Sequence, residues 1–350
     1  MEAASNKIVH RDEITDVAFT DSVNIPEKYI QPDDVCAVAV VGEDEAYELP
    51  VIDMARLLDP ELSASETAKL GSACRDWGFF QLTNHGVDEA VIQRMKDNTL
   101  QFFGMPLDSK NTVAVRGDGF EGYGHHYSRL SKLDWAESVI LITQPVGDRN
   151  MELWPTNPPM FRDALEEYSA AVAKLMRQLV GAMAAELGVG EEALQGAFAG
   201  NRQSAAIHRY PPCRRPEKVI GNTAHTDGLA LTVLLQADDT PGLQILRGGR
   251  WFPVRPAPGA LVVNVGDILH ILTNGAYRSV EHRVVVNAER GRTTAVIFQE
   301  ASVGGMVAPL LELLANGEVA RYRSIPRFEY LKVRFSALAK RRGFLESLKP

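Results

Sequence analysis

The spacing of apolar residues divides the chain into a helical half and a half rich in strands. Apolar runs predict two early strands, and apolar side chains at steps of three and four predict two helices. The strands are expected at residues 49–54 and 77–82, and the helices at residues 63–76 and 91–103. The longest periodic segment begins near Pro159 and stops at Gly188, a residue type common at helix ends. It predicts a long amphipathic helix at the centre of the molecule.

From about Ser204 the pattern changes to short β-rich runs separated by Pro, Gly and Asn. The runs are AAIHRY, LALTVLLQ, GLQIL, WFPVR, ALVVNV, SVEHRVVV and TTAVIF. Seven short strands at close spacing are typical of a sandwich or jelly roll. Helical spacing returns from Phe328 to Arg341, where we expect a closing helix outside the sheets. The predicted fold class is α+β, with a jelly-roll core (a double-stranded β-helix) flanked by helices.

The 350 residues show no internal repeat and no shift in composition that would separate independent domains. We therefore predict one structural unit made of four successive segments. They are an N-terminal arm (1–48), a helix-rich region that packs on the core (49–203), the jelly-roll core (204–305) and a C-terminal helical closing segment (306–350).

Charge and composition narrow the kind of partner. The chain has 37 Lys and Arg against 45 Asp and Glu, so its net charge of -8 offers no basic surface for nucleic acid. No apolar stretch reaches the roughly 18 to 20 residues needed to cross a bilayer. The three cysteines, Cys36, Cys74 and Cys213, are widely spaced and form no CxxC pair. This pattern fits a protein of a reducing compartment and argues against a structural zinc site. We expect a cytoplasmic protein that binds a small molecule, without a nucleic-acid, membrane or obligate protein partner.

The sequence AHTDG contains a candidate metal site. His225 and Asp227 are separated by one residue, and residues i and i+2 of a strand point to the same face. His282 lies 55 residues after Asp227 inside another predicted strand. Two histidines and one carboxylate leave three coordination positions open, as in non-haem Fe(II) oxygenases, for dioxygen and an organic co-substrate. The pair alone is a common pattern, and a strand histidine is more often structural than a ligand.

A second feature follows ten residues after His282. Arg292 offers a planar guanidinium to a carboxylate, and Thr294 places a hydroxyl two residues further on the same strand face. This arrangement predicts a negatively charged co-substrate near the metal site.

At this point the sequence resembles the plant-type 2-oxoglutarate and Fe(II)-dependent dioxygenases, which include flavonoid, gibberellin and alkaloid oxidases and have isopenicillin N synthase as a relative. The resemblance covers almost the whole chain, in ordered motifs at matching spacing. The motifs are LPVIDM (49–54), DWGFFQLTNHGV (76–87), GYG (122–124), YPPC (210–213), HTD (225–227), PGLQI (241–245), NVGD (264–267), LTNGAYRSVEHRV (272–284) and the triplet that begins at Arg292.

The resemblance implies a role for each of these residues. His225, Asp227 and His282 are expected to bind Fe(II), and Arg292 to pair with the distal carboxylate of 2-oxoglutarate, which Tyr210 also reaches. Dioxygen is the further co-substrate, and ascorbate is expected as the reductant. The implied reaction releases succinate and carbon dioxide while it oxidises a C–H bond of a hormone, indole, phenolic, flavonoid or terpenoid.

Two positions depart from the family pattern. Thr294 stands where the family usually has serine, which keeps the hydroxyl but adds a methyl group. His208 stands where the strand before YPPC commonly has asparagine, and alternation places it on the same face as Tyr210, beside the iron. Its role is either contact with the substrate or an ordinary structural replacement.

Other candidates for the pocket wall come from position alone. Phe298 lies six residues after Arg292 on the same face and matches a position where relatives carry an aromatic that stacks on substrate; the alternative is plain core. His126, Tyr127 and Ser138 fall in the variable segment that lines the substrate entrance in relatives. Asp267, by contrast, looks like turn chemistry at the barrel mouth.

Three functions remain open. The first is 2-oxoglutarate-dependent hydroxylation of a small, largely apolar plant metabolite, or the related demethylation or desaturation. The second is an ascorbate-dependent oxidase that uses no 2-oxoglutarate. The third is a jelly-roll binding protein without turnover, against which the presence of all three ligands beside Arg292 argues.

Overall fold

The computed structural model describes residues 25–32, 48–117, 119–124, 126, 132–198, 200, 202–300, 305–315, 317–339 and 344–350. Most of the predicted N-terminal arm, Cys36 and the candidate Tyr127 lie outside these residues. The short helix η1 (Glu27–Tyr29) is the part of the arm that is described, and its Tyr29 is buried with its ring edge-to-face against Trp135.

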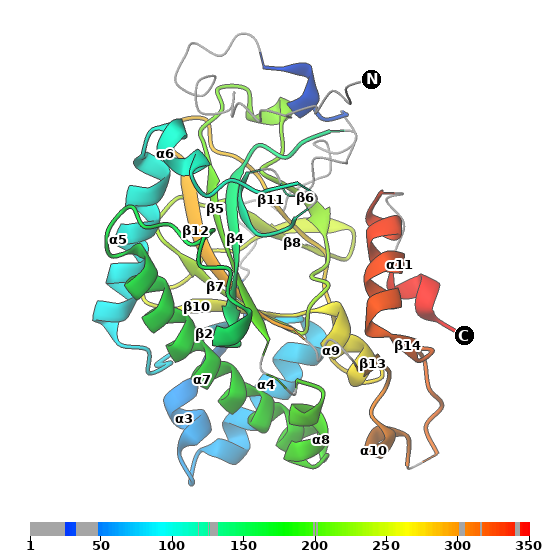
Figure 1. Ribbon diagram of the computed structural model, residues 1–350. Helices are drawn as coiled ribbons and strands as arrows, with labels where there is room; N and C mark the ends of the chain where they lie inside the picture. Colours follow the sequence, from blue (N-terminus) through cyan, green and yellow to red (C-terminus); the bar gives the residue numbers. More distant parts are fainter. Residues whose placement is uncertain are drawn as a thin grey trace.

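Two β-sheets form the centre of the molecule (Figure 1). The larger has the order β1-β2-β10-β7-β12-β5-β4-β3, and the smaller the order β6-β11-β8-β9. The strands of the larger sheet are β1 (Val51–Asp53), β2 (Phe79–Thr83), β10 (Leu261–Val265), β7 (Leu231–Gln236), β12 (Arg292–Gln299), β5 (Gln203–Tyr210), β4 (Glu137–Gln144) and β3 (Gly122–Gly124). Those of the smaller sheet are β6 (Asn222–His225), β11 (His282–Val284), β8 (Leu243–Arg247) and β9 (Arg250–Pro253), and β13 (Met306–Val307) pairs with β14 (Ile325–Pro326).

The long helix predicted from the periodicity is α7 (Phe161–Leu187), and its C-cap Gly188 is in the left-handed conformation at φ 68°. Figure 1 shows α7 beside α5 (Glu89–Gly104) against the large sheet, with α11 (Arg327–Ala339) on the other side of the molecule. The other helices are α3 (Met54–Leu58), α4 (Ser63–Asp76), α6 (Leu107–Asn111), α8 (Glu191–Gly196), α9 (Asp267–Leu272), α10 (Leu311–Leu314), η2 (Val146–Asp148), η3 (Pro216–Lys218) and η4 (Leu345–Leu348). Among the described residues, no helix is both long and apolar enough to span a bilayer.

The predicted α+β fold with a jelly-roll core, a long central helix and a closing helix is confirmed. Local differences have local causes. Met54 begins a helix instead of ending a strand, because the Asp53 carboxylate caps the N–H groups of Ala55 and Arg56. The apolar run 137–144 forms β4, a central part of the pocket wall that the sequence pattern did not separate from its variable surroundings.

We propose that the four predicted segments form one structural unit. The large sheet contains β1 to β4 from the helix-rich region and β5, β7, β10 and β12 from the predicted core. One hydrophobic cluster also joins Leu165 and Leu179 of α7 to Val233 of β7 and Ile297 of β12. Cutting the chain near residue 203 would therefore divide both the sheet and its apolar core.

Candidate metal centre and co-substrate pocket

The two candidate histidines meet where two strands of the smaller sheet pair. His225 is the last residue of β6 and His282 the first of β11, and they lie directly opposite each other in the antiparallel register. Their ring centroids are 4.3 Å apart. Asp227 completes the set, since the three candidate ligand atoms all lie within 4.8 Å of one another. Within the described part of the chain, these residues form the one His, Cys, Asp or Glu cluster of this kind.

The reason given by the sequence for the position of Asp227 was wrong in one respect. Strand β6 ends at His225, so strand alternation does not orient Asp227. The chain instead turns after His225, and the Asp227 carbonyl accepts a 2.7 Å hydrogen bond from the Asp267 N–H. The carboxylate therefore reaches the histidines from a loop whose position other contacts must fix.

Hydrogen bonds orient both imidazoles toward the carboxylate. His225 Nδ1 donates to the Thr223 carbonyl at 2.7 Å, and His282 Nδ1 donates to the Val280 carbonyl at 3.1 Å. Because a carbonyl only accepts, Nδ1 carries a proton in both rings, which leaves Nε2 as the nitrogen that can coordinate a metal. Each Nε2 lies 3.6 Å from Asp227 Oδ1.

The second oxygen of the carboxylate is held separately. Asp227 Oδ2 accepts hydrogen bonds from Thr232 Oγ1 at 2.6 Å and from Asn264 Nδ2 at 2.7 Å. Burial opposes the charge of Asp227, but His282, His225 and Asn264 together bring its pKa well below the ordinary value. Burial lowers the pKa of His282 to about 4. Burial opposes the charge of His225, but Asp227 raises the pKa of this imidazole above its ordinary value. An anionic oxygen, Oδ1, thus faces the Nε2 atoms of two imidazoles, a donor set that fits Fe(II).

Arg292 and Thr294 form a buried polar site that fits an anion. Arg292 is only 2% exposed, and among the described residues its side chain makes one hydrogen bond, a long 3.4 Å contact from Nη2 to the Gln236 side-chain oxygen. Its Nε and Nη1, and Thr294 Oγ1, are buried without a hydrogen-bond partner among the described residues. Because buried donors without partners are costly, this site fits a carboxylate that accepts from the guanidinium and the hydroxyl.

Tyr210 borders the same site. It lies opposite Arg292 in the pairing of β5 with β12, and the guanidinium carbon is 5.5 Å from its ring centroid. Burial raises the pKa of Tyr210 to about 12, so its phenol is neutral and can donate a hydrogen bond.

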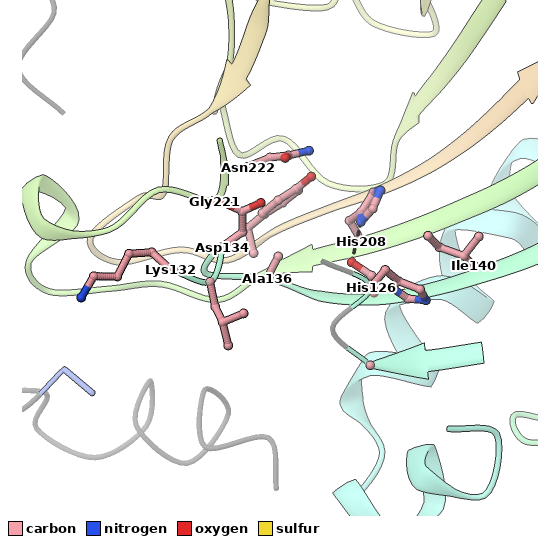
Figure 2. A pocket seen from close by; sticks show the side chains of 12 residues that line it. His126, Lys132, Asp134, Ala136, Ile140, His208, Gly221 and Asn222 are labelled. Carbon is pink, nitrogen blue, oxygen red and sulfur yellow. Dashed lines mark hydrogen bonds between the residues drawn. The ribbon is translucent and has the colours of Figure 1, made fainter. Parts of the chain in front are cut away.

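A cavity lies between this site and the segment before β4 (Figure 2). His208, Ser138, Tyr210 and His126 contribute to its wall. The Ser138 hydroxyl and His208 Nδ1 are hydrogen-bonded at 2.7 Å, and His208 Nε2 has no hydrogen-bond partner among the described residues. Burial lowers the pKa of His208 to about 3, with further contributions from His126 and Arg292. His208 is therefore a neutral group that can hydrogen-bond a ligand in the cavity.

The remaining candidates differ in their surroundings. Phe298 is half-buried and lies opposite Thr232, the residue whose hydroxyl binds Asp227. His126 is engaged locally, since its Nε2 is 3.0 Å from the Gly122 carbonyl and its ring lies against Phe120. Tyr127 falls outside the described residues.

Sequence reasoning missed the residues that hold the ligands. Thr232 and Asn264 were not singled out, although each is a polar residue inside an otherwise apolar strand, a pattern that often marks a buried hydrogen bond. The interpretation of Asp267 as turn chemistry was wrong. Asp267 is the buried first residue of α9, and its carboxylate accepts from Thr226, Ser279 and Arg334.

A mixed fold of this kind, with two imidazoles and one carboxylate around a point beside a buried arginine, defines a mononuclear non-haem iron oxygenase. Two family models match the chain. The non-haem dioxygenase in morphine synthesis N-terminal model covers residues 49–157, and the 2OG-Fe(II) oxygenase superfamily model covers residues 201–301. The chain belongs to the 2OG-Fe(II) oxygenase superfamily and is a 2-oxoglutarate-dependent dioxygenase.

Individual relatives span nearly the full length. Protein SRG1 of Arabidopsis thaliana is 39% identical over 329 residues, which cover 93% of this chain and 92% of the relative. S-norcoclaurine synthase 1 of Coptis japonica is 40% identical over 316 residues, or 88% and 87% of the two chains. The crystal structure of JOX2 in complex with 2OG, Fe and JA gives a TM-score of 0.84 at 29% identity and covers 96% and 97% of the two chains. The family resemblance inferred from the motifs is confirmed.

Proposed function

We propose that the protein hydroxylates a small, largely apolar plant metabolite, with Fe(II), dioxygen and 2-oxoglutarate, and releases succinate and carbon dioxide. The observation that carries the proposal is a pre-oriented His-Asp-His set next to a buried arginine with two unused donors. A metal site alone would not need the arginine, and an anion site alone would not need the oriented imidazoles.

We assign the roles as follows. His225, Asp227 and His282 hold Fe(II) through Nε2, Oδ1 and Nε2, while Arg292 and Thr294 bind the distal carboxylate of 2-oxoglutarate and Tyr210 donates to the same co-substrate. Bound Fe(II) supplies the redox chemistry that couples decarboxylation of 2-oxoglutarate to oxidation of a C–H bond. The chain orients both, excludes water from Arg292 and aims the substrate.

Substrate recognition falls to the cavity wall. His208 offers one neutral hydrogen-bonding group, fixed by Ser138, to an otherwise apolar ligand, and His126 belongs to the same wall. We assign Phe298, which lies opposite Thr232, to a separate part of the substrate site. The names of relatives support a small metabolite: one is an oxoglutarate-dependent flavonoid 7-O-demethylase of Ocimum basilicum, 37% identical, and JOX2 is solved with JA. They also make demethylation the main alternative reaction.

We further propose ascorbate as the reductant that maintains Fe(II), and the cytoplasm as the compartment. Cys74 and Cys213 are free and buried, which supports a reducing environment.

The test is an anaerobic titration of the metal-free protein with Fe(II) and 2-oxoglutarate, monitored by the weak visible band of the chelate. Oxygen is then admitted with a panel of flavonoids, alkaloids, jasmonates and auxins while succinate is measured. A band and succinate that depend on one metabolite would support the proposal. Bound iron without a band would favour the ascorbate-dependent oxidase or the binding protein, and no iron binding would overturn the metal assignment.

A further inference from the structure

The last helix of the chain contacts the loop that carries Asp227. Tyr330 Oη donates a 2.7 Å hydrogen bond to the Gly228 carbonyl, and Arg334 Nη2 donates a 2.6 Å hydrogen bond to the Thr226 carbonyl. Tyr330 and Arg334 are one turn apart on α11, so they share a helix face. The two carbonyls on either side of Asp227 are thus both held by α11.

Asp267 links this contact to both histidine segments. Arg334 Nη1 lies 2.7 Å from Asp267 Oδ2, which also accepts from Thr226 Oγ1 at 3.0 Å. Asp267 Oδ1 accepts from Ser279 Oγ at 2.7 Å. Thr226 lies between His225 and Asp227, and Ser279 precedes Val280, whose carbonyl orients His282. The buried Asp267 carboxylate therefore connects α11 to the loops of all three candidate ligands.

The position of Gly228 makes room for this arginine. A Cβ atom at Gly228 would lie 1.8 Å from Arg334 Nε and 2.4 Å from Arg334 Cδ and Cζ. The backbone of Gly228 is not in the left-handed region, so its conformation does not require glycine. Because glycine has no side chain, Arg334 can pack against residue 228, and the Arg334 side chain is only 12% exposed.

We propose that Arg334 is a positioning residue that holds the Thr226 to Gly228 loop in the geometry that binds Fe(II). The proposal rests on the proposed function of the three ligands. Because β6 ends at His225, no strand pairing holds the backbone of Asp227. Its direction depends on the hydrogen bonds of the loop carbonyls as well as on those that Thr232 and Asn264 donate to its carboxylate. Docking of α11 and retention of iron are then coupled, although α11 supplies no ligand.

The first experiment measures Fe(II) affinity by anaerobic titration of the full chain with Arg334→Leu. We expect affinity to fall about 10- to 100-fold, the loss typical when groups that orient metal ligands are removed. The matched control is Lys332→Leu, which removes the same charge from an exposed position of the same helix and should bind Fe(II) like the parent. Arg334→Lys keeps the charge but cannot bridge both acceptors, so it should recover only part of the affinity.

A thermal measurement separates positioning from general stabilisation. A purely structural arginine would lower the melting temperature of the metal-free and Fe(II)-loaded protein equally. A positioning residue would also reduce the increase in melting temperature that a fixed Fe(II) concentration produces, because that increase follows the affinity.

Gly228→Ala provides an independent disturbance, since its methyl group displaces Arg334. It should weaken Fe(II) binding in the parent but add little in an Arg334→Ala background, where all the crowding atoms are gone. The proposal is overturned if Arg334→Leu binds Fe(II) as tightly as Lys332→Leu. If Arg334→Leu did not fold, Arg334→Lys and Gly228→Ala would decide in the same assay. Failure of the parent to bind Fe(II) would instead contradict the proposed function.

Discussion

The metal centre and the proposed co-substrate site are built differently. At the metal centre, each imidazole Nδ1 and the second oxygen of Asp227 have hydrogen-bond partners within the chain, so that only the ligand atoms face one another. At the co-substrate site, Arg292 and Thr294 are buried with polar atoms that have no partner among the described residues. One site is oriented in advance by the protein, and the other requires a ligand to complete its hydrogen bonds.

This difference predicts opposite effects of mutation on the two sites. Removing a ligand-holding group from the metal centre leaves other buried groups without partners. Removing the Arg292 charge takes away a group that the chain itself does not satisfy, so the ligand-free protein should gain stability while it loses the co-substrate. The substitutions below, from the largest expected effect to the smallest, test that contrast.

Asp227→Ala is expected to abolish both iron retention and turnover. The loss should exceed the roughly 10- to 100-fold effect of removing a group that merely orients a ligand, because Oδ1 is itself a ligand and Thr232 and Asn264 lose their acceptor. Bound iron after desalting and succinate release are the measurements. The control is Asp239→Ala, whose 87% exposed carboxylate pairs only with the exposed Arg290. Full activity of Asp227→Ala would contradict the metal assignment.

Arg292→Leu should raise the KM for 2-oxoglutarate by about 100-fold or more, since each hydrogen bond to a charged group contributes about 1.5–3 kcal/mol. Iron affinity should be unchanged. In the ligand-free protein the unfolding free energy should rise by about 1–3 kcal/mol, because two unsatisfied buried donors disappear. Denaturant unfolding and 2-oxoglutarate saturation curves measure the two effects.

The neighbouring Arg290→Leu is the control for this substitution, because Arg290 is exposed and pairs with Asp239. Arg290→Leu should change neither the KM for 2-oxoglutarate nor the unfolding free energy of the ligand-free protein. A less stable Arg292→Leu protein would show that the chain satisfies Arg292 without a ligand, and the proposed contrast between the two sites would be wrong.

The sequence was sufficient for the long helices, for most strands of the core and for the three candidate metal ligands. Periodicity located α4, α5, α7 and α11. The first three each bury one stripe of mainly apolar residues along a continuous segment. The motifs brought His225, Asp227 and His282 to one point, and the geometry agrees. Features that depend on the sequence of one element or one motif could therefore be predicted.

The missed features depend on contacts between distant segments. Nothing local to Asp267 indicates that Arg334, 67 positions later, binds its carboxylate, nor that Gly228 leaves space for that side chain. The turn after His225 was likewise read as strand, since alternation and a turn both place residues i and i+2 near each other. The contacts of Arg334 with Asp267 and Gly228 depend on how α11 packs against the rest of the protein, and the local sequence pattern does not specify that packing.

The pH dependence of the unfolding free energy tests whether His208 is a buried neutral group. Its pKa is about 3 in the folded protein against 6.5 for an unperturbed histidine, so below pH 6.5 the unfolded chain takes up a proton that the folded protein does not. Stability should therefore fall as the pH drops. His208→Asn removes this proton uptake. Between pH 7.5 and pH 5 the unfolding free energy of the variant should therefore fall by up to about 2 kcal/mol less than that of the parent.

Denaturant unfolding of both proteins across this pH range is the measurement. The two unfolding free energies should run parallel above pH 7.5, where His208 of the parent is unprotonated in both the folded and the unfolded state. Parallel curves for the two proteins below this pH as well would mean that the His208 imidazole is protonated equally in both states and is not a buried neutral group.

Substitution of Thr294 is expected to have the smallest effect. It tests whether the hydroxyl binds 2-oxoglutarate or only stabilises the fold. It lies opposite His208 in the strand pairing, with its Oγ1 buried and without a partner among the described residues. Thr294→Val keeps the shape and removes the hydroxyl. The KM for 2-oxoglutarate should rise only about 2- to 10-fold, because Arg292 still neutralises the carboxylate and the hydroxyl then contributes about as much as one hydrogen bond between neutral groups. Thr294→Ser keeps the hydroxyl and should retain the parent KM. An unchanged KM in Thr294→Val would leave Arg292 as the sole anchor of the distal carboxylate, whereas a loss as large as that of Arg292→Leu would mean that the hydroxyl organises the guanidinium itself.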